Sequence, residues 1–211
     1  MRRFVDMLVF GGERRGAQNA PPPVWRRLFH VIAGSSIPLA GIFVSEAAMI
    51  WALSFLAGGG LSLDLARFRV GWLNRLFTGW MAPLLEQDEA SHITGATYML
   101  IAALLVYVLY GKEVAIPVMF FLSLGDPAAA LVGRRMPGPR IRGKSPLGTA
   151  AFIGVGAGAA AVLIVANGID HHWAIWAGAA VAGTVELASV PPDDNLAIPI
   201  IAGTAMHFLG L

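Results

Sequence analysis

Seven stretches of this chain are apolar over a length close to that of a membrane-crossing helix, which needs roughly 17–25 apolar residues. They cover residues 28–45, 47–66, 94–110, 114–132, 147–166, 173–190 and 196–211. Glycine and alanine are concentrated at 154–161 and 177–183. Because small residues let helices approach closely in lipid, these two runs predict packing faces. The whole pattern predicts an all-α integral membrane protein with seven transmembrane helices.

The stretch between 66 and 94 has a different, amphipathic pattern. Its apolar residues recur at helical spacing with charged residues among them: Leu73, Leu76, Phe77, Trp80, Met81 and Leu84, with Arg75 and Glu86. This spacing predicts a helix that lies in the membrane interface. The helix serves either as a lid over a lipid entrance or as a membrane-anchored connector.

Composition and charge agree with a membrane location. The chain is 56% hydrophobic and 13% charged, whereas soluble domains average about 25% charged residues. Lysine and arginine favour the cytoplasmic side of a membrane. With the N-terminus in the cytoplasm, all 15 of these residues except Lys112 lie in inner segments. Residues 1–24 are then a mobile cytoplasmic tail, and residues 25–211 form the transmembrane domain.

The unusual polar residues fall on the same inner side in this topology. They are His30, Glu89, His92, Asp126, Arg134, Arg135, Arg140, Arg142, Lys144, Glu186, Asp193, Asp194 and Asn195. A carboxylate inside a membrane costs about 2.5–3.5 kcal/mol and usually marks function. Asp126 and Glu186 either pair with nearby arginines as structural groups or belong to a site. Magnesium takes oxygen ligands and cations hold phosphate, so the set favours a magnesium–nucleotide site.

Residues 138–145, Gly-Pro-Arg-Ile-Arg-Gly-Lys-Ser, fit the phosphate-loop pattern G-x-x-x-x-G-K-S. That pattern acts between a strand and a helix, and no strand is predicted before it, so a P-loop fold is not expected. The local chemistry still suits an anion. Ser145 and Pro146 fit the N-cap and first position of a helix whose free amides lie beside Lys144. The alternative is that these cations only bind lipid headgroups and orient the chain.

Five groups of motifs follow one another along the chain. They are WRRLFHVIAG at 25–34, EASHITGATY at 89–98, GDPAAALVGRR at 125–135, GKSPLGT at 143–149, and VE at 185–186 with DNLAIP at 194–199. Together they resemble the CTP-dependent polyprenol kinase family, which includes dolichol kinase, phytol kinase and CTP-dependent diacylglycerol kinase. The resemblance implies transfer of the γ-phosphoryl group of CTP to the hydroxyl of a membrane lipid, giving a lipid monophosphate and CDP.

The resemblance also implies roles for individual residues. The residues expected to bind Mg²⁺ are Asp126, Asp194 and Asn195. The residues expected to bind the nucleotide are Arg27, Arg134, Arg135, Gly143, Lys144, Ser145, Gly148 and Asn195. The residues expected to act in catalysis are Asp126 and Lys144, with Glu89, Glu186 or His30 as the acceptor of the lipid hydroxyl proton. The sequence does not choose among these three acceptors.

Two other functions compete with the kinase. A CTP:phosphatidate cytidylyltransferase resembles the same family around the Gly-Asp and Lys-Ser motifs, but its signature ends in a His-Gly-Gly element that this sequence lacks. A transporter is less favoured, because the polar residues cluster on one side and mark no path through the membrane. We therefore expect a lipid alcohol, CTP and the bilayer as partners, and no nucleic acid. The expected location is a prokaryotic plasma membrane, with the site facing the cytoplasm.

Overall fold

The computed structural model describes residues 24–82, 84–85 and 89–211. In this part of the chain every regular element is helical and no strand forms, which confirms the predicted all-α class. The tail predicted for 1–24 lies outside the described residues except for Val24, as does Glu86. The elements are α2 (Val24–Phe43), α3 (Glu46–Arg69), α4 (Gly71–Met81), α5 (Gly95–Phe120), the π-helix η1 (Phe121–Gly125), α6 (Asp126–Arg135), α7 (Pro146–Val165), α8 (Trp173–Ala188) and α9 (Asp194–Phe208).

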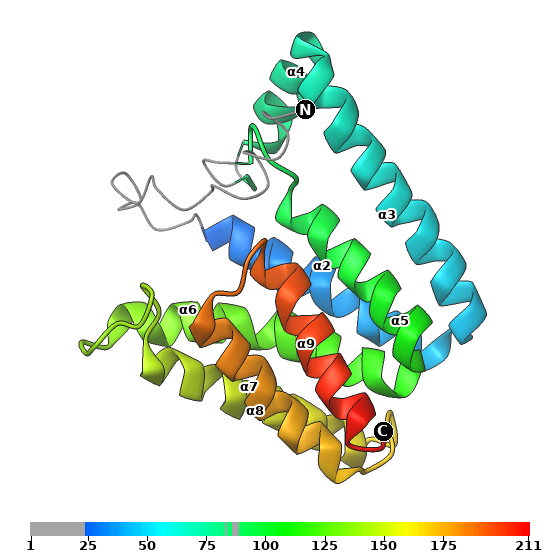
Figure 1. Cartoon of the computed structure of the whole chain (residues 1–211), viewed down its shortest axis with the longest axis vertical. Helices are drawn as coiled ribbons and strands as arrows, with labels where there is room; N and C mark the ends of the chain where they lie inside the picture. Colours follow the sequence, from blue (N-terminus) through cyan, green and yellow to red (C-terminus); the bar gives the residue numbers. More distant parts are fainter. Residues whose placement is uncertain (1–23, 83, 86–88) are drawn as a thin grey trace.

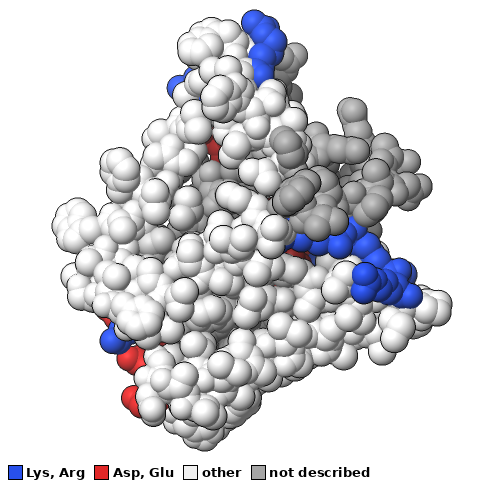
Figure 2. Space-filling model, turned by 180° about the vertical axis from the view of Figure 1, so that it is seen from behind, with Lys and Arg blue, Asp and Glu red and all other residues white. Residues whose placement is uncertain are grey.

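Some of the helices are long and apolar enough to cross a membrane. Among the described residues, three helical segments are long and apolar enough to cross a membrane: Glu46–Arg69, Gly95–Arg135 and Pro146–Val165. Helix α8 is apolar but shorter. Figure 2 shows charged side chains at the top, on the right and at the lower left of one face, with a wide uncharged surface between the last two groups. This distribution fits a protein whose middle lies in hydrocarbon.

Polar side chains fix where several of these helices begin. Ser45 accepts a hydrogen bond from the amide of Ala48 at the start of α3, and Thr94 accepts one from Thr97 at the start of α5. Asp193 caps α9 by accepting from the amide of Asn195. Such caps satisfy amides that have no partner within the helix. The helices therefore begin close to the predicted boundaries.

The long apolar segment Gly95–Arg135 turns back on itself. Gly111 has φ 76° and ψ 176°, a backbone conformation that suits glycine and breaks the helix. Glu46 Oε2 accepts the amide hydrogen of Lys112 just after this break, at 2.9 Å. The chain then returns through η1 to α6 (Figure 1). This turn separates the two segments predicted at 94–110 and 114–132.

Helix α4 matches the predicted amphipathic segment and is peripheral. It has no buried residue, and Trp72, Leu76 and Trp80 are exposed on one face. Figure 1 shows α4 at the end of the long helix α3, away from α7 and α8. An exposed tryptophan-bearing face on a short helix is typical of a membrane-interface element.

Glycines bring neighbouring helices close together, as the composition predicts. In α8, a Cβ at Gly178 would collide with Met206 of α9, and one at Gly183 would collide with Ile153 of α7. In α7, Gly156 packs on Phe121, whereas nothing described lies within 4 Å of a Cβ at Gly154. The predicted packing face is therefore confirmed for α8 and holds for one side of α7.

A buried arginine holds the end of α3 to the segment before α5. The Arg67 side chain is fully buried, and its Nε donates to Asp64 Oδ1 at 2.7 Å. The rings of Phe68 and Phe77 lie 4.5 and 4.6 Å from its guanidinium carbon. The guanidinium stacks between the two aromatic rings and pairs with a carboxylate, and both contacts compensate for the cost of burying this charge.

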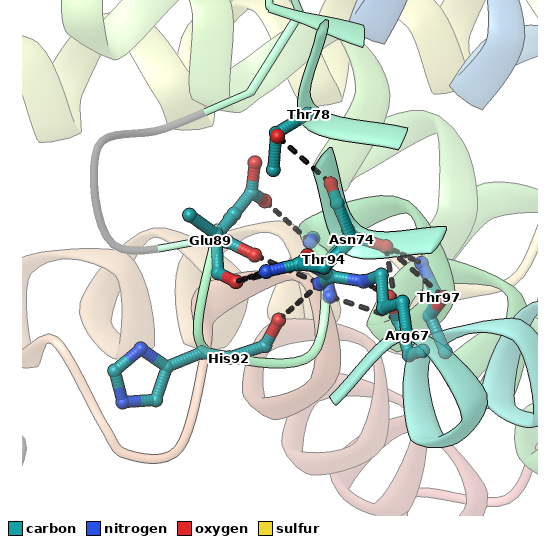
Figure 3. A network of polar contacts seen from close by, with 10 residues as sticks. Arg67, Asn74, Thr78, Glu89, His92, Thr94 and Thr97 are labelled. Carbon is teal, nitrogen blue, oxygen red and sulfur yellow. Dashed lines mark hydrogen bonds and ion pairs between the residues drawn. The ribbon is translucent and has the colours of Figure 1, made fainter. Parts of the chain in front are cut away.

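The rest of the Arg67 guanidinium binds backbone carbonyls (Figure 3). Nη2 donates to the carbonyls of Glu89 at 2.7 Å and His92 at 2.5 Å. Nη1 donates to the carbonyl of Ala90 and to Asn74 Oδ1. One side chain thereby fixes the path of residues 89–92 against α3 and α4.

Asp64 extends this network to the start of α5. Its Oδ2 accepts the amide hydrogen of Thr94 at 3.0 Å, and Thr94 in turn caps α5. The Asp64–Arg67 pair therefore holds in position both the segment that carries Glu89 and the first turn of α5.

Loss of Arg67 is expected to be strongly destabilising. Arg67→Leu leaves the buried carboxylate of Asp64 without its cation, and breaking a buried pair in this way costs about 3–5 kcal/mol. Arg67→Lys keeps the charge but cannot form all of the hydrogen bonds that the guanidinium donates. Its stability should therefore lie between those of the wild type and Arg67→Leu. Thermal unfolding in detergent, followed by circular dichroism, measures both. Arg69→Leu is the control, because Arg69 is exposed two residues further on; equal losses at both positions would contradict the assigned role.

Candidate nucleotide and metal site

The site lies where the first turns of α2, α5, α7 and α9 meet the last turns of α6 and α8. Lys144, directly before α7, contacts Glu186 of α8 and Asp194 of α9. Gly95, at the start of α5, lies beside Asn195 of α9. Segments far apart in the sequence thus place their polar ends together (Figure 1).

A tight turn presents Lys144. Ile141 and Lys144 exchange two backbone hydrogen bonds of 2.8 and 2.9 Å. Between them, Arg142 and Gly143 have φ values of 50° and 86°, the left-handed conformation that a two-residue hairpin turn requires. Ser145 then starts α7 with no side-chain cap, and Pro146 follows at the first helical position. The Gly-Lys-Ser motif therefore leads directly into a helix N-terminus, without the strand of a P-loop fold.

A cavity of about 250 Å³ lies against this N-terminus. Gly148 lines it at a point where α6 and α7 approach closely, because a Cβ there would lie 2.7 Å from the carbonyl oxygen of Ala129. The size suits the polyphosphate portion of a ligand, since pockets for whole small molecules measure about 300–1,000 Å³. Its lining residues are Asp126, Ala129, Ala130, Gly133, Arg134, Arg140, Gly143, Lys144, Ser145, Gly148 and Glu186.

Lys144 is shared between two carboxylates. Its Nζ lies 2.9 Å from Glu186 Oε1 and 2.7 Å from Asp194 Oδ2. Thr149 Oγ1 donates to the second oxygen of Glu186 at 3.0 Å. Burial opposes the charge on Lys144, but Asp194, Asp126 and Glu186 outweigh it and raise its pKa above the ordinary value. The ammonium group is therefore a permanent positive charge in the site.

The carboxylates around Lys144 are crowded. Burial raises the pKa of Asp194 to about 6; Lys144 opposes this rise, and the charges of Asp126 and Asp193 add to it. Burial also raises the pKa of Asp193, although Asn195 donates hydrogen bonds to it. A region with this excess of negative charge attracts a further cation.

Asp126 and Asp194 are the carboxylates here that could hold a magnesium ion together with ligand oxygens. Asp126 is the first residue of α6, directly after the π-helix η1, and π-helices often occur at functional sites. In the described part of the chain, no group of three or more histidine and carboxylate side chains forms a closed metal cage. Magnesium does not need one, because it usually binds one or two carboxylates together with substrate phosphates and water.

Two arginines at or next to this cavity form no ion pair among the described residues. Arg27 of α2 and Arg134 of α6 are close enough to repel each other, and the charge of Asp126 attracts Arg134. Among the described residues, neither guanidinium makes an ion pair or hydrogen bond, and Arg27 Nε is buried. Like charges that converge without a counter-ion are the arrangement expected of an anion site.

The other predicted cations have structural contacts or lie apart. Arg140 donates to the carbonyl of Gly133 at 2.6 Å, and Arg142 donates to that of Ala188 at 2.8 Å. These two arginines close the loop onto the last turns of α6 and α8. Arg135 is exposed and does not line the cavity. Of the predicted nucleotide contacts in this loop, the structure brings together Arg134, Gly143, Lys144, Ser145 and Gly148.

Glu89 belongs to a neighbouring cluster at the start of α5. Its Oε1 accepts the amide hydrogen of Gly95 at 2.6 Å, and Arg26 Nη1 lies 3.7 Å from Oε2. The Asn195 side chain lies beside Gly95 and donates to Asp193 Oδ1 at 2.8 Å. Asn195, predicted as a magnesium ligand, therefore lies on the Glu89 side, whereas Asp194 faces Lys144.

Sequence reasoning did not identify the Asp64–Arg67 pair that supports Glu89. Its signal was present: an acidic and a basic residue three positions apart near the end of an apolar helix, where buried charges are usually paired. It also missed Thr149, which holds Glu186 in place.

Comparison with known proteins shows a partial similarity to a bacterial protein. No protein-family model matches this chain, and no solved structure matches it. It is 25% identical over 130 residues to Uncharacterized protein RP860 of Rickettsia prowazekii (strain Madrid E). The match covers 60% of this chain and 63% of that protein. That relative is itself uncharacterised, so the match assigns no function to this chain.

Proposed function

We propose that this protein is a membrane lipid kinase that transfers the γ-phosphoryl group of CTP to the hydroxyl of a lipid alcohol. The observation that carries the proposal is the cavity at the α7 N-terminus, which Arg134 and Lys144 line and near which Arg27 lies without an ion pair among the described residues. Cations, free helix amides and two carboxylates are together the donor set for a magnesium-bound polyphosphate. The choice of CTP and of a lipid acceptor rests on the motif resemblance.

In this proposal each group has a defined task. Arg27, Arg134 and the α7 amides hold the phosphates and neutralise charge that develops during transfer. Lys144 keeps its bond to Glu186 while it contacts a phosphate oxygen. Asp126 and Asp194 would hold the magnesium ion, which supplies further charge neutralisation on the β- and γ-phosphates.

We also propose seven membrane spans with the site on the cytoplasmic side of a prokaryotic plasma membrane. Splitting Gly95–Arg135 at Gly111 and counting α2, α3, α7, α8 and α9 gives this number. The starts of α2, α5, α7 and α9 then share one side with nearly all lysines and arginines, as the positive-inside rule requires.

Single cysteines test this topology, because the natural chain has none. Lys112→Cys in intact cells should react with a membrane-impermeant maleimide, since the Gly111 turn would face outward. Arg69→Cys, also at an exposed position, should react only after the membrane is opened. The reverse pattern would show that the site faces outward.

Phosphoryl transfer tests the activity directly. Purified protein in detergent is given γ-³²P-CTP, Mg²⁺ and a panel of polyprenol, dolichol, phytol and diacylglycerol; label should appear in a lipid. Asp126→Asn should lower the rate about 100-fold or more, as loss of a key electrostatic group does. Asp170→Asn, at an exposed position outside the site, should not. Pyrophosphate release with phosphatidate, and no labelled lipid, would instead indicate a cytidylyltransferase.

Removing either unpaired arginine should affect stability and CTP binding differently. Arg27→Gln or Arg134→Gln removes a like-charge repulsion, so the empty protein should melt at the same temperature or higher. Each variant should bind CTP about 10- to 100-fold more weakly, because a charged hydrogen bond contributes about 1.5–3 kcal/mol. Arg75→Gln, on the exposed face of α4, is the matched control. Equilibrium dialysis with labelled CTP measures binding, and unchanged affinity would contradict the phosphate assignment.

A further inference from the structure

The structure separates the three candidates for the group that accepts the lipid hydroxyl proton, an inference that rests on the proposed kinase activity. Such a group needs an acceptor atom that is not already bonded within the protein. Glu186, Glu89 and His30 differ sharply in this respect.

Glu186 has both oxygens engaged. One lies 2.9 Å from the Lys144 ammonium, and the other accepts from the Thr149 hydroxyl at 3.0 Å. The residue is 3% exposed. A carboxylate held between a cation and a hydroxyl positions Lys144, and neither of its oxygens is left without a partner.

Glu89 is committed to the local fold. Its Oε1 binds the amide of Gly95 at 2.6 Å, and Oε2 faces Arg26 at 3.7 Å. Its own carbonyl is held by Arg67. This residue caps α5 and orients Arg26, so its carboxylate has a structural task already.

His30 differs, because its Nε2 atom is buried and has no hydrogen-bond partner among the described residues. A neutral imidazole carries one nitrogen that can accept a proton. A buried polar atom without a partner costs free energy, which suggests that a ligand group supplies the missing bond.

The position of His30 follows from the packing of α2. One turn later, Gly34 packs closely on Ser123, because a Cβ at Gly34 would lie 2.9 Å from the Cβ of Ser123. One turn earlier, Arg27 lies near Arg134. Helix α2 therefore runs antiparallel to η1 and α6, and His30 lies opposite the first turns of α6, where Asp126 begins the helix.

Apolar side chains next to His30 are exposed on the surface of α2. Phe29 and Ile32, on either side of His30 in sequence, are 43% and 61% exposed. A hydrocarbon chain packed along this apolar surface of α2 would carry its terminal hydroxyl toward the site while the tail stays in lipid.

We propose that His30 Nε2 is the catalytic base for the lipid alcohol. It takes the hydroxyl proton as the lipid oxygen bonds to the γ-phosphorus. The bond from the γ-phosphorus to the β–γ bridging oxygen breaks, and CDP leaves with that electron pair. The proton then passes from the imidazole to water at the membrane surface, which returns His30 to its neutral form.

The experiment compares His30→Gln and His30→Asn with wild type and with Asp170→Asn, a control at an exposed position outside the site. Three quantities are measured in detergent: kcat for lipid phosphorylation, CTP affinity by equilibrium dialysis with Mg²⁺, and kcat with a fluorinated lipid alcohol whose hydroxyl is more acidic. Loss of a general base should lower kcat about 10²- to 10⁴-fold. CTP affinity should be unchanged, and the loss should shrink with the acidic acceptor, which needs less help in releasing its proton.

The possible results are distinct. Retention of most of the wild-type kcat by His30→Gln would overturn the role of His30. A loss of CTP affinity, or an equal loss of rate with both acceptors, would mean that His30 is structural and would also overturn it. A wild-type protein that binds CTP but phosphorylates no alcohol would overturn the proposed function itself, and the assignment of a base with it.

Discussion

The ammonium group of Lys144 is the interaction on which the candidate site depends. It joins the start of α7 to Glu186 of α8 and Asp194 of α9, over 2.9 and 2.7 Å. Removing one partner of such a group leaves an unpaired charge in a semi-buried place, which is far costlier than the pair itself is stabilising. The three helix ends are therefore fixed relative to one another, and the cavity between α6 and α7 acquires a defined wall.

This arrangement leaves the charges of the site unbalanced in two places. Carboxylates crowd around Lys144, and the pKa of Asp194 rises to about 6 as a result of burial, with contributions from Asp126 and Asp193. On the α2 side, Arg27 and Arg134 repel each other, and neither forms an ion pair among the described residues. A divalent cation relieves the first imbalance and a polyphosphate the second. One magnesium nucleotide would supply both at once, which is the physical basis of the kinase proposal.

Sequence patterns predicted the helices better than the direction of individual side chains. Apolar runs, capping residues and the amphipathic α4 segment depend on local spacing, so they could be read directly. Whether Asp194 or Asn195 faces Lys144 depends on the rotation of α9, which its packing on α5 and α8 decides. Arg140 and Arg142 were indistinguishable in sequence from phosphate ligands, yet they bind backbone carbonyls. Arg67 was not identified because its partners lie up to 25 residues away.

The Asp193–Asp194–Asn195 turn links the two halves of the site. Asp194 faces Lys144 and the cavity, whereas Asp193 and Asn195 lie toward Gly95 and the Glu89 cluster. Glu89 is in turn held by Arg67, whose guanidinium fixes the segment between α4 and α5. Contacts therefore run without a break from Asn74 of α4 to the start of α9, by way of Arg67, Glu89 and Gly95.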